Sequence, residues 1–170
     1  MRRKLLFVGL VFGLVASRVV TAQTTQPSLA GSWQFTLTPV SPSANPVAMV
    51  PIQALATFTA DGSTIETDAA GAVPTRPTAA VVITSTTPGH GIWQPGPAIG
   101  TLFIQFISFV VNPNGTVHGK RTVTITGSLD STGDQFKGSY QSQVVDTTGR
   151  VIATGSGNVT GQRIPHPLLP

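Results

Sequence analysis

The segment VHGKRTVTITGSL, residues 117–129, alternates between two kinds of side chain along its length. Lys120, Thr122 and Thr124 occupy one set of alternate positions, and Val123 and Ile125 occupy the other. A period of two residues is typical of a β-strand with one face in the core. The segment is longer than an ordinary strand, so it restricts the chain to folds built on a large β-sheet.

The remaining sequence also favours strands over helices. It is rich in Thr, Val, Gly and Ser, and helical periodicity appears nowhere after residue 22. Residues 136–145 alternate as well, with Phe136, Tyr140 and Val144 on one face. Further strands are predicted at residues 32–37, 53–59, 63–67, 79–85 and 92–93. We therefore predict an all-β protein.

Short turn signals connect these strands. Asp61-Gly62, Pro113-Asn114-Gly115 and two Asp-led segments, 130–134 and 146–149, supply the Gly, Asn and Asp that tight turns need. From residue 99 onward they predict a four-stranded antiparallel meander. Seven or eight strands joined by hairpins predict an antiparallel up-and-down β-barrel, because closure removes exposed edges. A β-sandwich is the alternative.

The first 22 residues have the pattern of a signal peptide. Arg2, Arg3 and Lys4 precede an apolar stretch over residues 5–16, and small residues end at Ala22. The apolar stretch is too short to cross a bilayer, which needs roughly 20 residues. We expect a secreted or periplasmic protein with a single barrel domain over residues 23–170. Within it, residues 39–51 are expected to form an irregular proline-rich loop and residues 164–170 a disordered tail.

Removal of the signal peptide would also remove the positive charge of the chain. Four of the ten basic residues lie in residues 1–22, which leaves six bases against six acids. A neutral chain offers no electrostatic attraction to nucleic acid or to an anionic membrane, so neither is expected as a partner. The sequence has no cysteine, so stability must come from packing and hydrogen bonds rather than disulfides.

The segment TLFIQFISFVV, residues 101–111, is apolar on both faces. One face should fill the barrel, and the other should be covered, since exposed apolar surface costs roughly 25 cal/mol per Å². The cover would be either the 39–51 loop or a second copy of the chain, which would make a homo-oligomer. The two faces available for the interior are Phe103, Ile107 and Phe109, or Leu102, Ile104 and Phe106.

Arg121 is the first candidate for a ligand contact. Its position in the alternation places it with Val123 and Ile125, so it should point into the barrel. A buried guanidinium needs a partner, which could be Glu66, Asp68 or a bound carboxylate. Two alternatives stay open: a bulge at Gly119 would turn Arg121 out to solvent, and the two acids could lie at a solvated strand end.

The other ligand-binding candidates are aromatic or titratable. Tyr140 and Phe136 share the predicted interior, and Glu66 has the geometry of a paired carboxylate. His90 and Trp93 lie in TPGHGIWQPGP, where the glycines predict a corner at one mouth of the barrel. The three histidines have no metal-ligand spacing and the chain has no cysteine, so no metal or cofactor is expected. No catalytic residue is assigned.

The motif Gly31-Ser32-Trp33, just before the first predicted strand, resembles the G-x-W signature of lipocalins and other calycin barrels. The resemblance implies that Trp33 closes the barrel floor and that Arg163 packs across its ring. The ending IPHPLLP lacks the C-terminal helix of lipocalins, and the allene oxide cyclase and dirigent barrels are similar too. The segments GHGIW, FKGSY and VVDTTGRV also resemble small exported bacterial proteins of unassigned role.

These features lead to three hypotheses about function. The first is a non-enzymatic exported barrel that binds a small hydrophobic or amphipathic ligand. The second is a cyclase or isomerase that folds a flexible substrate in the barrel cavity. The third is an oligomeric surface or interaction protein that uses residues 101–111 as its interface. The fold alone does not choose among them.

Overall fold

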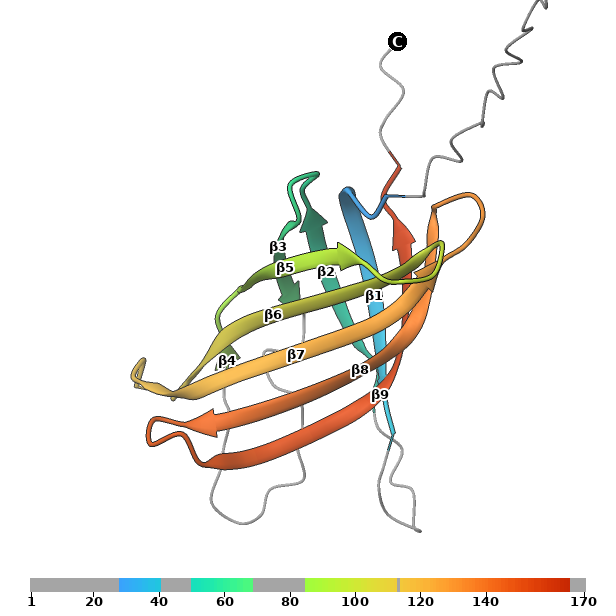
Figure 1. Ribbon diagram of the computed structural model, residues 1–170. Coiled ribbons are helices and arrows are strands. Elements are labelled where there is room, and N and C mark those ends of the chain that lie inside the picture. The colour runs from blue at the N-terminus through green and yellow to red at the C-terminus, as the bar shows by residue number, and fades with distance from the viewer. Residues whose placement is uncertain (1–27, 41–49, 69–84, 113, 166–170) are drawn as a thin grey trace, which may run out of the picture.

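The structure, a computed structural model, describes residues 28–40, 50–68, 85–112 and 114–165. Within this part of the chain the regular elements are β-strands and no residue is helical. None of these residues therefore belongs to a helix able to span a membrane. The strands are β1 (Gly31–Pro39), β2 (Ile52–Phe58), β3 (Ser63–Asp68), β4 (Ser85–Thr86), β5 (Gly89–Pro95), β6 (Thr101–Val111), β7 (Val117–Leu129), β8 (Gln135–Asp146) and β9 (Val151–Arg163) (Figure 1).

The sheet closes on itself as an eight-stranded antiparallel barrel. Its order is β6-β5-β3-β2-β1-β9-β8-β7, and β7 pairs with β6 to complete the ring. The two-residue β4 lies outside the ring and pairs with the end of β6. The predicted closed up-and-down barrel is confirmed, and the sandwich is wrong because the first and last strands, β1 and β9, pair with each other.

Several sequence predictions fall outside the described residues. They are the signal peptide over residues 1–22, most of the 39–51 loop, residues 79–84 of one expected strand and the last five residues of the tail. The hairpin predicted at 53–59 and 63–67 is present as β2 and β3, and the short strand expected at 92–93 is the longer β5.

The register defines two rims of the barrel. At the tryptophan rim, β1 begins at Gly31 and β9 ends at Arg163. At the opposite rim, β1 ends at Pro39 and β3 ends at Asp68. The strands β6 to β9 are long, and Figure 1 shows them sweeping past the shorter, steeper β1 to β3 at that opposite rim.

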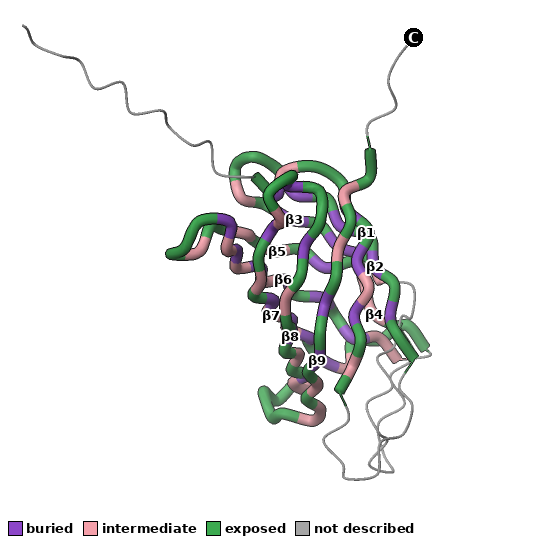
Figure 2. Tube along the Cα trace, turned by 90° about the vertical axis from the view of Figure 1, so that its right-hand side faces the viewer, coloured by how far each residue is buried: buried purple, intermediate pink, exposed green. Residues whose placement is uncertain are grey.

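The interior is filled by side chains from alternate positions of every long strand, and buried and exposed residues alternate along the trace (Figure 2). An aromatic layer lies next to the tryptophan rim. Phe35 stacks 6.0 Å from Trp33 and makes edge contacts with Phe58 at 6.0 Å and Phe136 at 5.7 Å between ring centroids. Such pairs add about 0.5–1.5 kcal/mol each beyond simple burial.

Inward glycines provide the space for these rings. Gly161 lies opposite Phe35 in the β1–β9 register, and a Cβ added to it would come within 2.4 Å of the ring. Gly157 has the same relation to Tyr140, at 2.8 Å. A ring that packs over a glycine of the neighbouring strand covers its exposed backbone, so these glycines are required for packing.

The tryptophan rim is closed by Trp33 and Arg163. The indole is fully buried and donates a hydrogen bond to the Leu29 carbonyl at 2.8 Å. The Arg163 guanidinium lies 4.5 Å from the centre of the indole ring, and it also donates to the carbonyls of Ser28 and Gly133. This is the arrangement that the resemblance to calycin barrels implied.

The two apolar faces of β6 are now distinguished. Leu102, Ile104 and Phe106 point into the barrel. The other face points outward, where Ile107 is 40% exposed and Phe109 is 52% exposed.

Candidate binding site

A buried ion cluster lies inside the barrel towards the opposite rim. Arg121 of β7 is only 4% exposed. Its Nη1 lies 2.7 Å from Asp68 Oδ2, its Nη2 lies 3.8 Å from Glu66 Oε2, and its Nε donates to Ser108 Oγ at 3.1 Å. The prediction that Arg121 points inward is confirmed, and of the partners that the sequence left open, the structure shows the two acids.

Strand register explains why these side chains meet. Arg121 is the direct partner of Ser108 in the β6–β7 ladder. A bulge is present in β7, but its extra residue is His118, so Gly119 and Arg121 keep their inward positions. Neither alternative is therefore correct: Arg121 is not turned to solvent, and Glu66, at 5% exposure, does not lie at a solvated strand end.

Glu66 is the electrostatically unusual member of the cluster. Burial, with a further contribution from the negative charge of Asp68, raises the pKa of Glu66 from 4.5 to about 7, although Arg121 opposes the shift. Its Oε2 accepts no hydrogen bond from any described residue. Arg121 makes its short contact with Asp68. Its positive charge therefore stabilises the Asp68 carboxylate more closely than the Glu66 carboxylate.

A small cavity lies beside Glu66. Its volume is about 10 Å³, which is close to the space needed for one water molecule. Thr64, two residues before Glu66 on the same face of β3, also lines it, and the buried Thr64 Oγ1 has no hydrogen-bond partner among the described residues. The remaining walls are apolar: Phe35, Leu37, Ala54, Ala56, Phe58, Ile104, Phe106 and Ile125.

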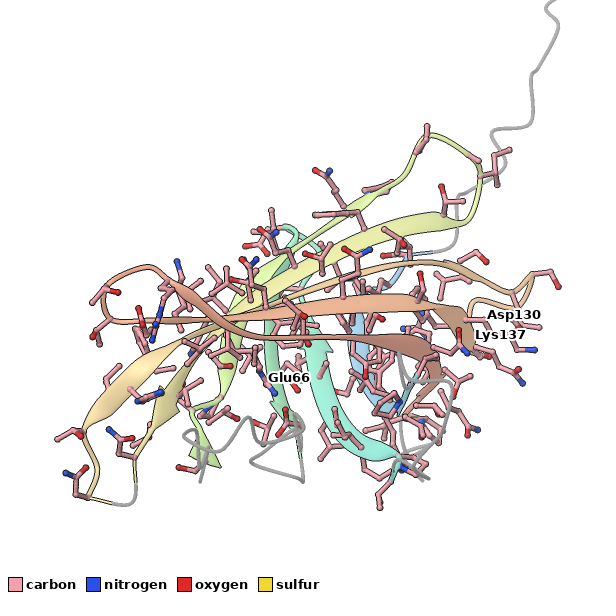
Figure 3. All side chains as sticks on the ribbon, turned by 90° about the horizontal axis from the view of Figure 1, so that it is seen from below. Glu66, Asp130 and Lys137 are labelled. Atoms are coloured by element: carbon pink, nitrogen blue, oxygen red, sulfur yellow. The ribbon has the colours of Figure 1, made fainter. Side chains whose placement is uncertain are left out.

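Figure 3 shows where this site lies in the barrel. Glu66 projects from β3 among the strands, whereas Asp130 and Lys137 lie well away from it. Asp130 follows β7 and caps the turn that leads into β8, accepting hydrogen bonds from the backbone amides of Asp134 and Gln135. The Asp130 carboxylate thus helps to form the hairpin, whereas Glu66 is buried and belongs to the wall of the cavity.

The glycines of GHGIW lie on β5, between β3 and β6 in the sheet. Gly89 and Gly91 occupy the inward positions of β5. A Cβ on Gly89 would lie 2.7 Å from the Phe106 ring and 3.0 Å from Glu66 Oε2, and one on Gly91 would lie 1.9 Å from the Gln105 carbonyl. The segment predicted as a corner is therefore a strand. Gly89, which has no side chain, leaves room there for Phe106 and Glu66.

The other predicted ligand residues are dispersed. Phe136 and Tyr140 are buried but do not border this cavity. The Tyr140 hydroxyl has no hydrogen-bond partner in the described part of the chain, and burial raises its pKa. Trp93 lies nearer the tryptophan rim, where its Nε1 donates to the Thr59 carbonyl at 2.8 Å, and His90 is exposed on the outside of β5. The structure brings Glu66 and Arg121 together and leaves these four elsewhere.

Sequence reasoning missed Thr64 and Ser108. In STIETD, residues 63–68, the apolar Ile65 faces outward at 52% exposure while Thr64 and Glu66 face inward. In this strand the polar residues face inward and the apolar residue faces outward, the reverse of the usual pattern. Thr64 could have been identified only because it lies two residues from Glu66 and therefore shares its face. Within the described residues, no group of three or more His, Asp or Glu side chains is placed to hold a metal ion.

The fold and the site define a class of protein. It is a closed up-and-down β-barrel, compatible with a calycin-like barrel, with a tryptophan and an arginine at one rim and a buried ion cluster towards the other. Comparison of the chain with protein-family models, with curated proteins and with solved structures finds no match.

Proposed function

We propose that this protein is an exported, non-catalytic barrel that binds a small hydrophobic or amphipathic ligand in its interior. One observation carries the proposal: the barrel interior holds a small cavity with eight apolar wall residues, and two residues of the same wall, Thr64 and Glu66, each have a buried oxygen, Oγ1 and Oε2, without a hydrogen-bond partner among the described residues. Leaving such a group unsatisfied costs about 1–3 kcal/mol. A ligand that donates a hydrogen bond there would recover that free energy.

The size of the cavity determines how a ligand would enter. The present space accommodates about one non-hydrogen atom beside Glu66. The apolar part of the ligand needs further room, which rotation of the Phe58 and Phe106 rings would provide. The cyclase alternative would need the same enlargement of the cavity.

The first test is retention of a ligand. The full-length protein would be purified without denaturant after expression in a bacterial host, then exposed to mixed lipids and pigments and examined by native mass spectrometry. We expect a retained species of stoichiometric mass. Ala56→Val, which fills the cavity wall, should abolish retention, and Ala60→Val, in the exposed β2–β3 turn, should leave it unchanged. Failure to retain any species would refute the proposal.

Export is a separate part of the proposal and has its own test. The basic, apolar and small-residue regions of residues 1–22 support cleavage after Ala22. Amino-terminal sequencing of the protein recovered from the periplasm or medium should begin at Gln23. Recovery of the uncleaved chain from the cytoplasm alone would contradict export.

A second candidate function is assembly through the outer face of β6. Ile107 is 40% and Phe109 is 52% exposed there. The register continues this surface to His90 and then to Ile65, itself 52% exposed. A second copy of the chain would cover these side chains, since burying apolar surface yields roughly 25 cal/mol per Å². Light scattering should then show a dimer that Phe109→Ser dissociates, and a wild-type monomer at micromolar concentration would exclude this function.

A further inference from the structure

We propose that Asn114 is a site of spontaneous covalent modification, at which the backbone nitrogen of Gly115 attacks the asparagine side chain and converts it to aspartate or isoaspartate. This inference does not depend on the proposed function. It follows from the position of the pair in the turn between β6 and β7, from the open space around Gly115, and from the hydrogen bonds that Thr116 donates to Asn114.

The backbone at Gly115 is unobstructed. Its φ is 81°, and a Cβ built on it would meet no heavy atom within 4 Å. Asn114, Gly115 and Thr116 are all exposed to solvent. A side chain on the residue after an asparagine hinders the approach of that residue's nitrogen to the asparagine Cγ, and glycine has no such side chain. Water and hydroxide also reach this turn.

Thr116 polarises the amide group that is attacked. The Oδ1 atom of Asn114 accepts hydrogen bonds from the Thr116 backbone nitrogen at 3.1 Å and from the Thr116 hydroxyl at 2.7 Å. The first of these bonds closes a ring that includes the peptide bond between Asn114 and Gly115, so the side chain is held beside that bond. Negative charge develops on Oδ1 when a nitrogen adds to Cγ, and donors already directed at this atom lower the barrier.

The reaction needs only water and hydroxide from the solvent. Hydroxide removes the amide proton of Gly115, and the nitrogen forms a bond to Asn114 Cγ. The bond between Cγ and Nδ2 breaks, and ammonia leaves after taking a proton from water. The product is a succinimide ring, which water opens at either carbonyl to give aspartate or isoaspartate. Nothing is oxidised or reduced, and the reacting groups belong to neighbouring residues, so little entropy is lost in bringing them together.

One hydrogen bond opposes the reaction. The Gly115 backbone nitrogen donates to the Asn112 carbonyl at 2.9 Å, so this nitrogen is free to react only when the turn opens. Exposed turns open at a lower free energy than strands that are paired on both sides. The rate at Asn114 is therefore set by the opening of the turn and not by unfolding of the barrel.

The other asparagines are internal controls. The chain has four. Asn45 and Asn112 each precede a proline, whose nitrogen has no proton to lose. Asn158 precedes the β-branched Val159 in β9, and both residues pair with β1 on one side and with β8 on the other. Asn114 should therefore be the asparagine that reacts first.

Incubation of the purified full-length protein at mildly alkaline pH tests the assignment. Samples taken over days would be digested and analysed by mass spectrometry, and by chromatography that separates aspartate from isoaspartate. A synthetic peptide of residues 110–118 is the positive control for the conditions. We expect both products at Asn114, formed at least about tenfold faster than at Asn158 and faster as the pH rises. An unchanged Asn114, or equal conversion of Asn158, would overturn the proposal.

Two variants test the role of Thr116 as a positioning residue. Thr116→Val removes the hydroxyl donor and should slow conversion of Asn114 about two- to tenfold. Thr116→Ser keeps the hydroxyl and should react at about the wild-type rate. Circular dichroism would confirm that both variants fold. Conversion of Thr116→Val at the wild-type rate or faster would show that the hydroxyl does not activate the amide, and the assigned role of Thr116 would be wrong.

Discussion

Replacing Glu66 by Gln should remove a pH dependence of stability that the buried carboxyl imposes on the barrel. In the folded protein the pKa of Glu66 is about 7 rather than 4.5, because burial disfavours the charged form, Asp68 adds to the effect and Arg121 only partly opposes it. The folded state therefore binds this proton more tightly than the unfolded state does. By linkage, the free energy of unfolding must fall as the pH rises from 4.5 to above 7.

The size of the effect follows from the two pKa values. A rise from 4.5 to about 7 corresponds to roughly 3 kcal/mol, developed fully at about pH 8 and absent below pH 4.5, where both states are protonated. This is a large part of the total stability of an ordinary domain, about 5–15 kcal/mol. Glutamine keeps the shape of the protonated side chain and does not titrate, so Glu66→Gln should lack this loss.

Urea unfolding followed by tryptophan fluorescence measures the difference. Between about pH 4.5 and pH 8, wild type should lose roughly 3 kcal/mol relative to Glu66→Gln. The contributions of the other carboxyls largely cancel in this comparison. Asp134→Asn, at an exposed position, should follow wild type. Parallel curves for wild type and Glu66→Gln would refute the reasoning and would mean that Glu66 is not desolvated in the folded protein.

Three further substitutions test the packing of the barrel, each by the free energy of unfolding in urea. Arg163→Ala should lower the free energy of unfolding by about 2–4 kcal/mol through loss of the contact with the Trp33 ring and of several hydrogen bonds to backbone carbonyls. A loss under about 1 kcal/mol would contradict the stabilising role of Arg163 at the tryptophan rim. Arg121→Met should cost about 3–5 kcal/mol at neutral pH, because it leaves buried carboxylates without their partner, and an unchanged midpoint would disprove that pairing. Gly91→Ala should cost about 1–3 kcal/mol, since its Cβ would overlap a backbone carbonyl. The control Gly155→Ala, whose Cβ would meet only a hydroxyl, should change the free energy of unfolding by no more than about 0.5 kcal/mol. Equal effects would refute the steric explanation.

The sequence predicted those features that depend on local pattern. Alternation in residues 117–129 identified the inward positions of β7, and the same parity in β8 placed Phe136, Tyr140 and Val144 inside. Parity is a local property, because successive side chains of a strand point to opposite faces whatever the partner strand is. The turns were equally local, since Gly and Asp favour them through their own backbone and side-chain geometry.

The sequence predicted the ion pair only as one of several outcomes. It indicated that Arg121 needs a partner and named Glu66 and Asp68, but it did not choose them over a bound carboxylate. The choice depends on which strands face each other across the closed barrel, and that is fixed by strand order and register. His90 and Trp93 were named as ligand candidates because a titratable and an aromatic side chain lie together at a predicted corner of the barrel mouth, yet alternation along β5 places His90 on the outer surface.

What the sequence determined by itself is the strand content, the hairpin order and the inward face of each strongly alternating strand, because these depend on neighbours within a few residues. Tertiary structure decided the rest. Both faces of β6 are apolar, so local pattern could not select one, and the ladder that sets Ser108 opposite Arg121 made the choice. In β3, Ile65 faces solvent while Thr64 and Glu66 face the interior. Contacts made only when the barrel closes override the hydrophobic preference of so short a strand.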